Sequence, residues 1–502
     1  MTDTVHESTA LAVRRQWWLV AVVVVAAWCG TAIELPQACL LPIALGLCLV
    51  CALNDYHGLL LLAICLPVSP EINLGAIITP GVRTGIFGHE SGQPVSISLY
   101  DLLILSLWCG LLFRQCLQGR LALRIDPSVR ALMGFVLWGG ASILVNLSTL
   151  RGGQATVCLL YLFKFFEVSS LYVLVLNILK DKTQIVTILR ALLVGGGVQL
   201  CIGLLFLLCI DPHEPGANPL TPFFSTFVQD RINYFGFSLL TVALLSCFLV
   251  FRNPWVHAPW LRMGCAVAIL LHLLMVALTF KRTLLVGLFC VGWYVFWVRR
   301  MLWVPILLGA VVLLTLYGGS ADFRGKMAIT LGQRSDIAFG TWSDPKLVEQ
   351  ATPLREWIGG EVQMDPSLAE RLMKWYVTWS HMDMKTFVFG RGFFASQFYL
   401  GYHPHNMYLQ LLFEVGLVGA LLLLRVLYIV ARQCRALARW PHVPWYAQFL
   451  GISTSAVLLA FAFIGTTDEI FYFFQLMTSF WLLVALVRSS YAHFSVMPRG
   501  FR

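Results

Sequence analysis

Charged residues are scarce in this 502-residue chain, since only 12% of its residues are Asp, Glu, Lys or Arg. A soluble globular chain usually carries about 25% charged residues and about 45–50% apolar residues. Here 59% of the residues are hydrophobic, and the mean hydropathy is +0.78. These values exclude a disordered protein, a disulfide-stabilised secreted domain and an ordinary cytosolic enzyme. They predict a chain that meets lipid along most of its length.

Cysteine is absent from the longest polar segment, 319–406, although the chain has 14 cysteines. Nearly all of them lie in apolar stretches, where a free cysteine behaves as a small hydrophobic residue. A disulfide framework is therefore not expected. Cys48 and Cys51 form a C-x-x-C pair in an apolar run without a second ligand pair nearby, so a zinc site is not expected either. The chain also lacks internal repeats and low-complexity tracts.

Long apolar runs, in contrast, are abundant and predict fourteen helices. They lie near 16–33, 38–53, 57–69, 98–114, 131–148, 157–179, 184–210, 233–251, 262–279, 284–298, 302–318, 407–431, 446–464 and 468–487. The second and third are short for a bilayer that needs about 20 residues, so they are either full spans or re-entrant segments. The predicted fold class is an all-α polytopic membrane protein with 12–14 transmembrane helices and one long, partly helical periplasmic loop.

The distribution of Lys and Arg predicts the orientation. One set of connections, with both termini, holds eighteen basic residues and five acidic ones, whereas the opposite short loops hold few basic residues. Both termini are therefore expected in the cytoplasm, and the net charge of +10 records this threading, not a nucleic-acid partner. The first helix lacks a signal-peptidase cleavage site and is interpreted as a retained signal anchor.

This threading divides the chain into four parts and places the long polar segment in the periplasm. The parts are a first transmembrane body over 1–318, the loop 319–406, C-terminal transmembrane helices over 407–487 and a cytoplasmic tail over 488–502. A loop of that length is usually functional or disordered, and its tryptophans and spaced aliphatics favour a folded one. A helix is expected over 366–388, with Leu368, Leu372, Trp375 and Trp379 on the face that contacts the membrane body.

The most distinctive motif stands where this loop meets the next helix. It reads His403-Pro-His405-Asn406, followed by nine residues and then Gly416-x-x-Gly419. On a helix, positions 405, 409, 412, 416 and 419 form one stripe, so His405 is predicted on top of a face where glycines admit a neighbouring helix. An interfacial histidine without a special role, and a metal site through His403 and His405 that lacks a third ligand, remain alternatives. Glu414 falls off the stripe and is not expected to orient His405.

Basic residues on the predicted outer side form a second candidate group, because the positive-inside rule makes them scarce there. They are Arg231, Lys281 and Arg282 in a short turn, Arg371, and Arg391 within Phe389-Gly390-Arg391-Gly392. Paired arginine donors suit phosphate oxygens, so several such groups suit a lipid-linked diphosphate. The alternative is a set of arginines that reach to headgroups or form salt bridges.

Two further sets of ionisable residues have structural explanations. Lys164 and Glu167 lie inside an apolar run at a spacing of three, which predicts an ion pair within one helix, with a role in lining the site as the alternative. Asp468 and Glu469 belong to the last outer turn, where ordinary solvated residues at a helix end explain them as well as a functional role does.

In this order, these residues resemble the O-antigen ligase and O-antigen polymerase superfamily of bacterial inner-membrane proteins. The most specific part of the resemblance is 367–420, which includes Arg371, Trp375, Gly390 and Gly392, and the His405 motif with its two glycines. The Lys281-Arg282 turn also stands where the family keeps a basic residue before a helix. The whole architecture, with one long periplasmic loop before the last helices, is similar as well.

The resemblance implies glycosyl transfer, without a metal or other cofactor, from an undecaprenyl-diphosphate-linked glycan to a sugar hydroxyl. His405 is then the base, and Arg282 and Arg371 bind the diphosphate and stabilise its charge. The remaining site residues are expected to bind substrate or to shape the backbone: Lys281, Arg231, Arg391, His403, Asn406 and Trp375 for binding, and Gly416, Gly419, Gly390 and Gly392 for structure. The expected partners are the donor, a glycan acceptor, membrane lipid and other polysaccharide export components.

The long outer loops tilt the prediction towards a polymerase of exopolysaccharide or O-antigen repeats, with an O-antigen ligase that acts on lipid A core as the alternative. A lipid-linked sugar transporter is an alternative of another class, although such proteins usually have repeats and polar residues at the membrane midplane. A metal-dependent oligosaccharyltransferase needs acidic residues in the first outer loop, where Glu34 stands alone. A metal-free enzyme that glycosylates protein hydroxyls also stays open.

Overall fold

The computed structural model describes most of the predicted membrane body and the end of the long loop. The described residues are 37–68, 71–73, 96–119, 122–150, 153–209, 231–250, 259–278, 282–299, 366–440 and 442–495. The helices predicted over 16–33 and 302–318, and most of the long loop before residue 366, lie outside these ranges. The predicted domain boundary at 318 also falls outside them.

The described elements are almost all helices, as the apolar runs predict. The first part contains α2 (Gln37–Leu53), α3 (Asp55–Cys65), the 3₁₀ turn η1 (Leu66–Val68), α5 (Leu99–Leu117), α6 (Pro127–Val145), α7 (Gln154–Ile178) and α8 (Lys182–Cys209). The middle part contains α10 (Arg231–Val250), α11 (Pro259–Leu278) and α12 (Arg282–Arg299). The last part contains α17 (Pro366–Ser380), α18 (Met384–Phe389), α19 (Ser396–Leu400), α20 (Met407–Arg439), α21 (Trp445–Ile464), the 3₁₀ turn η2 (Ile470–Tyr472) and α22 (Phe474–Ser495).

Within the described ranges the only sheet is a two-stranded antiparallel ribbon. Strand β1 (Glu71–Asn73) pairs with β2 (Ser96–Ser98), with Ile72 opposite Ile97. Seven helices are long and apolar enough to cross a membrane, judged on length and composition over the described residues. The all-α polytopic fold class is thereby confirmed, while the full number of 12–14 spans stays a prediction.

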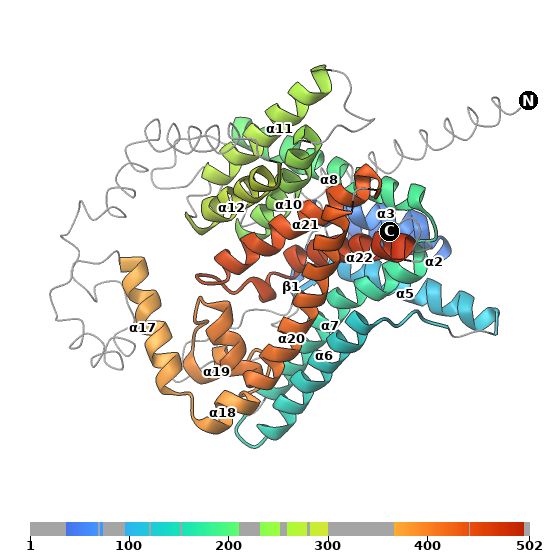
Figure 1. The fold of residues 1–502 in the computed structure, drawn as a ribbon. Helices are drawn as coiled ribbons and strands as arrows, with labels where there is room; N and C mark the ends of the chain where they lie inside the picture. Colours follow the sequence, from blue (N-terminus) through green and yellow to red (C-terminus); the bar gives the residue numbers. More distant parts are fainter. Residues whose placement is uncertain are drawn as a thin grey trace, which may run out of the picture.

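The centre of the bundle is α22, whose residues from Gln475 to Val487 are almost all buried. It packs against α7 and α21, and α20 packs against α21 and α6 (Figure 1). Trp481 of α22 is 1% exposed and meets the Tyr172 ring of α7 edge to face, with 6.3 Å between the centroids. Close van der Waals packing of large aromatic and aliphatic side chains holds such helices together, because lipid offers no hydrophobic driving force between them.

One ion pair and one hydrogen bond join α22, α6 and α7 at the end of the bundle away from His405. Arg488 of α22 donates to Asp126, the N-cap residue of α6, with 2.6 Å between Nε and Oδ2. The Tyr172 hydroxyl donates to the same carboxylate oxygen at 3.0 Å. The structure thus brings together residues that the sequence assigns to one side of the membrane. That this side faces the cytoplasm stays a prediction.

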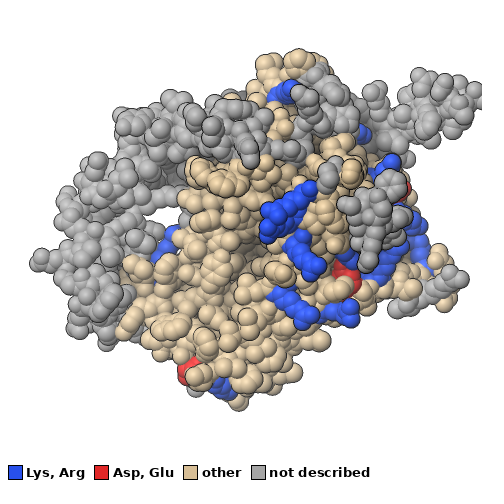
Figure 2. All heavy atoms as spheres, viewed as in Figure 1, with Lys and Arg blue, Asp and Glu red and all other residues tan. Residues whose placement is uncertain are grey.

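Basic side chains are distributed unevenly over the face in Figure 2. They gather away from α17, α18 and α19, over the part of the bundle that holds the C-terminal half of α20. Arg425, Arg432, Arg435 and Arg439 are exposed along this half of α20. The cluster is what the positive-inside rule expects of one membrane face.

Three sequence predictions about the helices are wrong in detail. The helix expected over 366–388 is divided into α17 and α18, because the Asp383 carboxylate caps α18 by accepting from the Thr386 amide at 2.6 Å. The face of α17 that is buried holds Met373, Lys374, Val377 and Thr378, whereas Trp379 is 59% exposed. Burial is thus shifted from the predicted stripe, because Lys374 lies over the ring of Tyr402, 5.5 Å from its centroid.

The third concerns α22. Helix α22 begins at Phe474 rather than at 468, and it continues to Ser495 beyond the predicted end at 487. Residues 465–473 therefore form a connection instead of a helix start. Lys164 of α7 forms an ion pair with Asp101 of α5, a contact between two helices that the sequence spacing does not predict. Asp101 also accepts the Ser98 amide at 2.6 Å, which fixes the start of α5.

Candidate functional site

The site is built around the turn that precedes α20. His405 has a φ of +52°, a conformation that only a few per cent of residues other than glycine adopt. Asn406 then caps α20, because its side-chain oxygen accepts the amides of Tyr408 and Leu409 at 3.1 and 3.0 Å. His405 consequently lies outside the helix and not on its glycine face, so the predicted continuous stripe from 405 to 419 is wrong.

The connection between α21 and α22 holds this turn in place. The Met407 amide donates to the Gly465 carbonyl at 2.7 Å, and the Asn406 side-chain amide donates to the Thr466 carbonyl at 3.2 Å. Two segments that are 60 residues apart in sequence are thereby joined at one end of the bundle. This junction brings Glu469 to His405.

His405 and Glu469 form a pair, with 2.9 Å between Nδ1 and Oε2. The His405 side chain is 35% exposed and that of Glu469 is 12% exposed. Burial alone would raise the pKa of Glu469, but its hydrogen bond to His405 and the nearby imidazole charges outweigh this and lower it to about 2. A carboxylate can only accept, so it holds the proton on Nδ1 and leaves Nε2, the second ring nitrogen, as an acceptor.

Asp468 lies beside this pair. The ligand atoms of His405, Asp468 and Glu469 are all within 4.8 Å of one another, a spacing that could hold a metal ion. Two carboxylates and one imidazole suit a divalent cation. Of the two alternatives for Asp468 and Glu469, that of ordinary solvated residues is therefore wrong, since Glu469 is bound to His405 and Asp468 is buried.

His403, in contrast, lies inside the protein. It is 8% exposed, and its Nδ1 lies 3.3 Å from the Gln410 side-chain nitrogen. Its ring lies 5.3 and 5.7 Å from the rings of Phe394 and Tyr472. Burial lowers its pKa to about 4, so His403 is neutral and accepts the Gln410 amide. This position favours support of the turn over direct substrate contact, which remains a prediction.

His403 should make the stability of the protein depend on pH. Because its pKa is about 4 when folded and about 6.5 when unfolded, the unfolded chain takes up its proton first as the pH falls. Stability should therefore decrease from pH 6.5 towards pH 4, by about 2 kcal/mol from this group at pH 5. Thermal unfolding of the purified protein against pH measures it. His403→Gln keeps an acceptor and should flatten the dependence, and equal slopes in both proteins would exclude this cause.

Glu414 is the buried centre of the next layer and is 1% exposed. Its carboxylate accepts the Phe394 amide at 3.1 Å, the Ser396 hydroxyl at 2.5 Å and the Gln410 side chain at 3.1 Å, and it also accepts the Tyr472 hydroxyl. One carboxylate thus links α20 with the loop before α19 and with η2. Glu414 does not orient His405, as the sequence predicts, but it fixes the segments on which His403 and Glu469 lie.

Two glycines permit the backbone crossing beneath this layer. Gly416 interrupts α20 with φ +67° and ψ −178°, and Gly390 ends α18 with φ +78°. A Cβ on Gly416 would lie 2.3 Å from the Val388 carbonyl oxygen, and one on Gly390 would lie 2.2 Å from that of Glu414. Only glycine fits such an approach, and only glycine adopts these φ values at little cost.

The interruption frees helix carbonyls, and neighbouring segments use them. The Arg391 and Gly392 amides donate to the carbonyls of Phe413 and Glu414 at 2.8 and 2.9 Å. The Trp138 indole of α6 donates to the Val415 carbonyl at 2.8 Å. At Gly419 a Cβ would lie 3.0 Å from Trp138, so α6 approaches there as well. The break in α20 is thereby compensated by hydrogen bonds to the loop and to α6.

The structure describes the side chains of only some of the basic residues predicted for the site. Arg391 forms an ion pair with Asp383 at 3.1 Å and lies over the Tyr399 ring, so it is engaged within the loop. Arg371 and Trp375 are half-buried on α17. Arg231 and Arg282 begin α10 and α12, but their side chains, and the whole of Lys281, lie outside what the structure describes. Their convergence on His405 stays a prediction.

Glu469 is the functional candidate that the sequence interpretation missed. The sequence offered one signal. Glu469 lies in the connection after the second of the two helices that follow His405, so it is predicted on the same side of the membrane as His405. Tyr472 was also missed, because contacts between distant segments leave no spacing pattern, whereas Gln410 stands at an i, i+4 spacing from Glu414 on α20 that could have identified it. The relevant distances are set by the junction of residues 406–407 with 465–466.

The comparisons with known proteins agree with the motif. A family model described as O-antigen ligase matches residues 266–424, about a third of the chain. The matched segment begins within α11 and ends within α20, so it contains the His405 turn, the Gly390–Gly416 crossing and α17. No curated protein matches the chain.

Proposed function

We infer that this chain, which residues 266–424 assign to the O-antigen ligase and polymerase superfamily, moves a glycan from a lipid-linked diphosphate onto a sugar hydroxyl. The family supports a glycan transferase of the ligase or polymerase type, with a lipid-linked glycan and an acceptor as substrates. The observation that carries the finer proposal is the pair of His405 and Glu469 at the partly exposed end of the bundle.

In the proposed reaction, His405 acts as general base. Its Nε2 takes the proton of the acceptor hydroxyl while that oxygen forms a bond to the anomeric carbon of the donor glycan. The bond between this carbon and the diphosphate oxygen breaks, and the diphosphate leaves with the electron pair, so the anomeric centre is inverted. Glu469 keeps Nδ1 protonated and stabilises the imidazolium that forms.

The leaving diphosphate needs charge stabilisation more than it needs a proton. We assign this task to Arg282 at the start of α12 and to Arg371 on α17, with Lys281 and Arg231 as further groups that bind the phosphates. Asn406 and Trp375 remain proposed contacts to the glycan. Arg391 is bound to Asp383, so its proposed contribution is to hold the loop that contacts substrate.

The donor is proposed to be linked to undecaprenyl diphosphate in the outer leaflet of a bacterial inner membrane. In this orientation both termini are cytoplasmic and the His405 end of the bundle faces the periplasm. Exopolysaccharide or O-antigen polymerisation is the first choice of reaction, and ligation to lipid A core is the second. The long polar segments on the proposed outer side support the first choice.

The group of His405, Asp468 and Glu469 favours one competing mechanism. Their ligand atoms, within 4.8 Å of one another, would suit a divalent cation that stabilises the leaving diphosphate. A cation held there would replace the hydrogen bond between His405 and Glu469 with bonds to the metal, and His405 would then be a ligand instead of a base.

The test uses the purified protein with a lipid-linked oligosaccharide donor and a gel to separate products. With EDTA present, we expect undiminished transfer, because the proposed base needs no metal. Loss of transfer in EDTA that Mg²⁺, Mn²⁺ or Ca²⁺ restores would favour the metal mechanism. A ladder of repeat lengths identifies a polymerase, a glycan on added lipid A core identifies a ligase, and no product with either acceptor would contradict the proposed transfer.

A further inference from the structure

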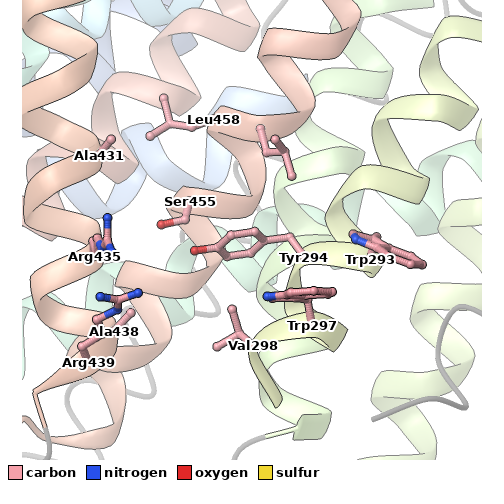
Figure 3. Close-up of a pocket in the computed structure, with 11 residues that line it drawn as sticks. Trp293, Tyr294, Trp297, Val298, Ala431, Arg435, Ala438, Arg439, Ser455 and Leu458 are labelled. Atoms are coloured by element: carbon pink, nitrogen blue, oxygen red, sulfur yellow. The ribbon is translucent and has the colours of Figure 1, made fainter. Parts of the chain in front are cut away.

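A second feature lies at the opposite end of α20 from His405. It is a groove of 1260 Å³ between α12, α20 and α21. Figure 3 shows Arg435 and Arg439 of α20 on one side and Tyr294 and Trp297 of α12 on the other, with Ser455 of α21 between them. The volume exceeds the about 300–1,000 Å³ of typical small-molecule sites.

The groove runs from the membrane surface into the apolar interior. Arg435 is 28 residues beyond Met407, which corresponds to about 40 Å of helix and exceeds the about 30 Å hydrocarbon layer. Leu458 lies 13 residues into α21, or about 20 Å along its axis. The groove therefore has arginines at a membrane surface and leucines at depth.

The walls are apolar and rich in tryptophan. Trp293 and Trp297 stack with 6.4 Å between their centroids, and they are 45% and 69% exposed. The rest of the apolar lining consists of Val298, Ala431, Ala438, Leu458 and Leu459. Tryptophan at the end of a span is typical of a membrane–water interface. The exposed aromatic surface suits acyl chains and the glycerol region of a lipid.

The charge in the groove is entirely positive. Arg435 and Arg439 are one helical turn apart and both exposed. Helices α12 and α21 contain no Asp or Glu, and the single acid of α20 is Glu414, near its other end. The lining thus offers two guanidinium groups and no carboxylate, so a bound anion would supply the opposite charge.

We propose that this groove binds an anionic glycerophospholipid. The phosphodiester pairs with Arg435 and Arg439, and an acyl chain lies along Trp297 and Leu458. A basic pocket between transmembrane helices with an apolar floor is a typical lipid headgroup site. A polar nucleotide or sugar does not fit, because the described lining offers few hydrogen-bonding groups besides the arginines, Tyr294 and Ser455.

The experiment titrates the full-length protein in detergent with phosphatidylglycerol or with phosphatidylcholine of the same acyl chains, and counts bound lipids by native mass spectrometry. Phosphatidylglycerol should bind about tenfold more tightly than phosphatidylcholine. The double variant R435Q/R439Q should lose this preference. The matched control R425Q/R432Q removes the same charge from exposed positions of α20 outside the lining and should retain it.

Ala431→Trp separates a groove from a charged surface, because it fills the groove and leaves both arginines. It should lower phosphatidylglycerol binding about tenfold or more, while size-exclusion profiles confirm a folded protein. Equal loss in R425Q/R432Q, unchanged binding in Ala431→Trp, or no preference in the wild type would each overturn the proposal. The proposal would also be overturned if native mass spectrometry showed a polypeptide, instead of a lipid, that stays bound to the wild type and is lost in R435Q/R439Q.

Discussion

Transfer by the His405→Ala variant is expected to fall by about 10²–10⁴-fold, the usual contribution of a general base. The loss should appear in single turnovers with a saturating lipid-linked donor, because the proton is removed in the bond-forming step. His405 lies in a turn outside α20 and its side chain is 35% exposed. The truncation therefore removes little buried surface, and the thermal stability of the variant should stay close to that of the wild type.

The matched control for His405→Ala is His381→Ala, an exposed histidine between α17 and α18 that should leave the rate unchanged. Glu469→Gln should also slow transfer, by up to about 10⁴-fold, the loss seen when the carboxylate that holds a catalytic histidine in its tautomer becomes an amide. A His405→Ala protein with wild-type turnover would remove His405 from the reaction. Equal losses in His381→Ala would point to a disturbed fold instead.

Gly416→Ala is expected to have the largest effect on stability, a loss of about 2–5 kcal/mol. The new Cβ would lie 2.3 Å from the Val388 carbonyl oxygen and 2.6 Å from the Gly390 amide nitrogen, and alanine would be held at φ +67°. Both partners are backbone atoms, so the crossing of α18 over α20 must open. Thermal unfolding followed by size exclusion in detergent measures the loss.

Gly197→Ala is the control for this substitution. Gly197 lies within α8, and a Cβ there would meet no atom within 4 Å. Alanine is the better helix former by about 0.5–1 kcal/mol, so this variant should be as stable as the wild type or slightly more stable. Wild-type stability of Gly416→Ala would contradict the close crossing of Gly390 and Gly416.

The sequence predicts the helices well, because apolar runs of membrane length leave few alternatives. Predicted and observed bounds agree within about four residues for most described helices, for example 157–179 against Gln154–Ile178 for α7. The prediction fails where a single polar contact decides. Asp383 divides one expected helix into α17 and α18, and the start of α22 moves to Phe474.

The site is harder to predict, because its geometry depends on contacts between distant segments. The motif identifies His405 and the glycines, but helical spacing gives the wrong position for His405, since Asn406 caps α20 and Gly416 interrupts it. Lys374 against Tyr402 decides which face of α17 is buried, and no periodicity encodes that contact. Glu469 can be assigned to the site only from the structure, because the hydrogen bond between Met407 and Gly465 brings its connection to the His405 turn.

The central claim is that Glu469 orients His405 as the base, and a double-mutant cycle of single-turnover transfer tests it most directly. Glu469→Gln should slow transfer in the wild-type background and should have no further effect in His405→Ala, because the carboxylate acts through the imidazole. An equal loss from Glu469→Gln in both backgrounds would contradict the claim.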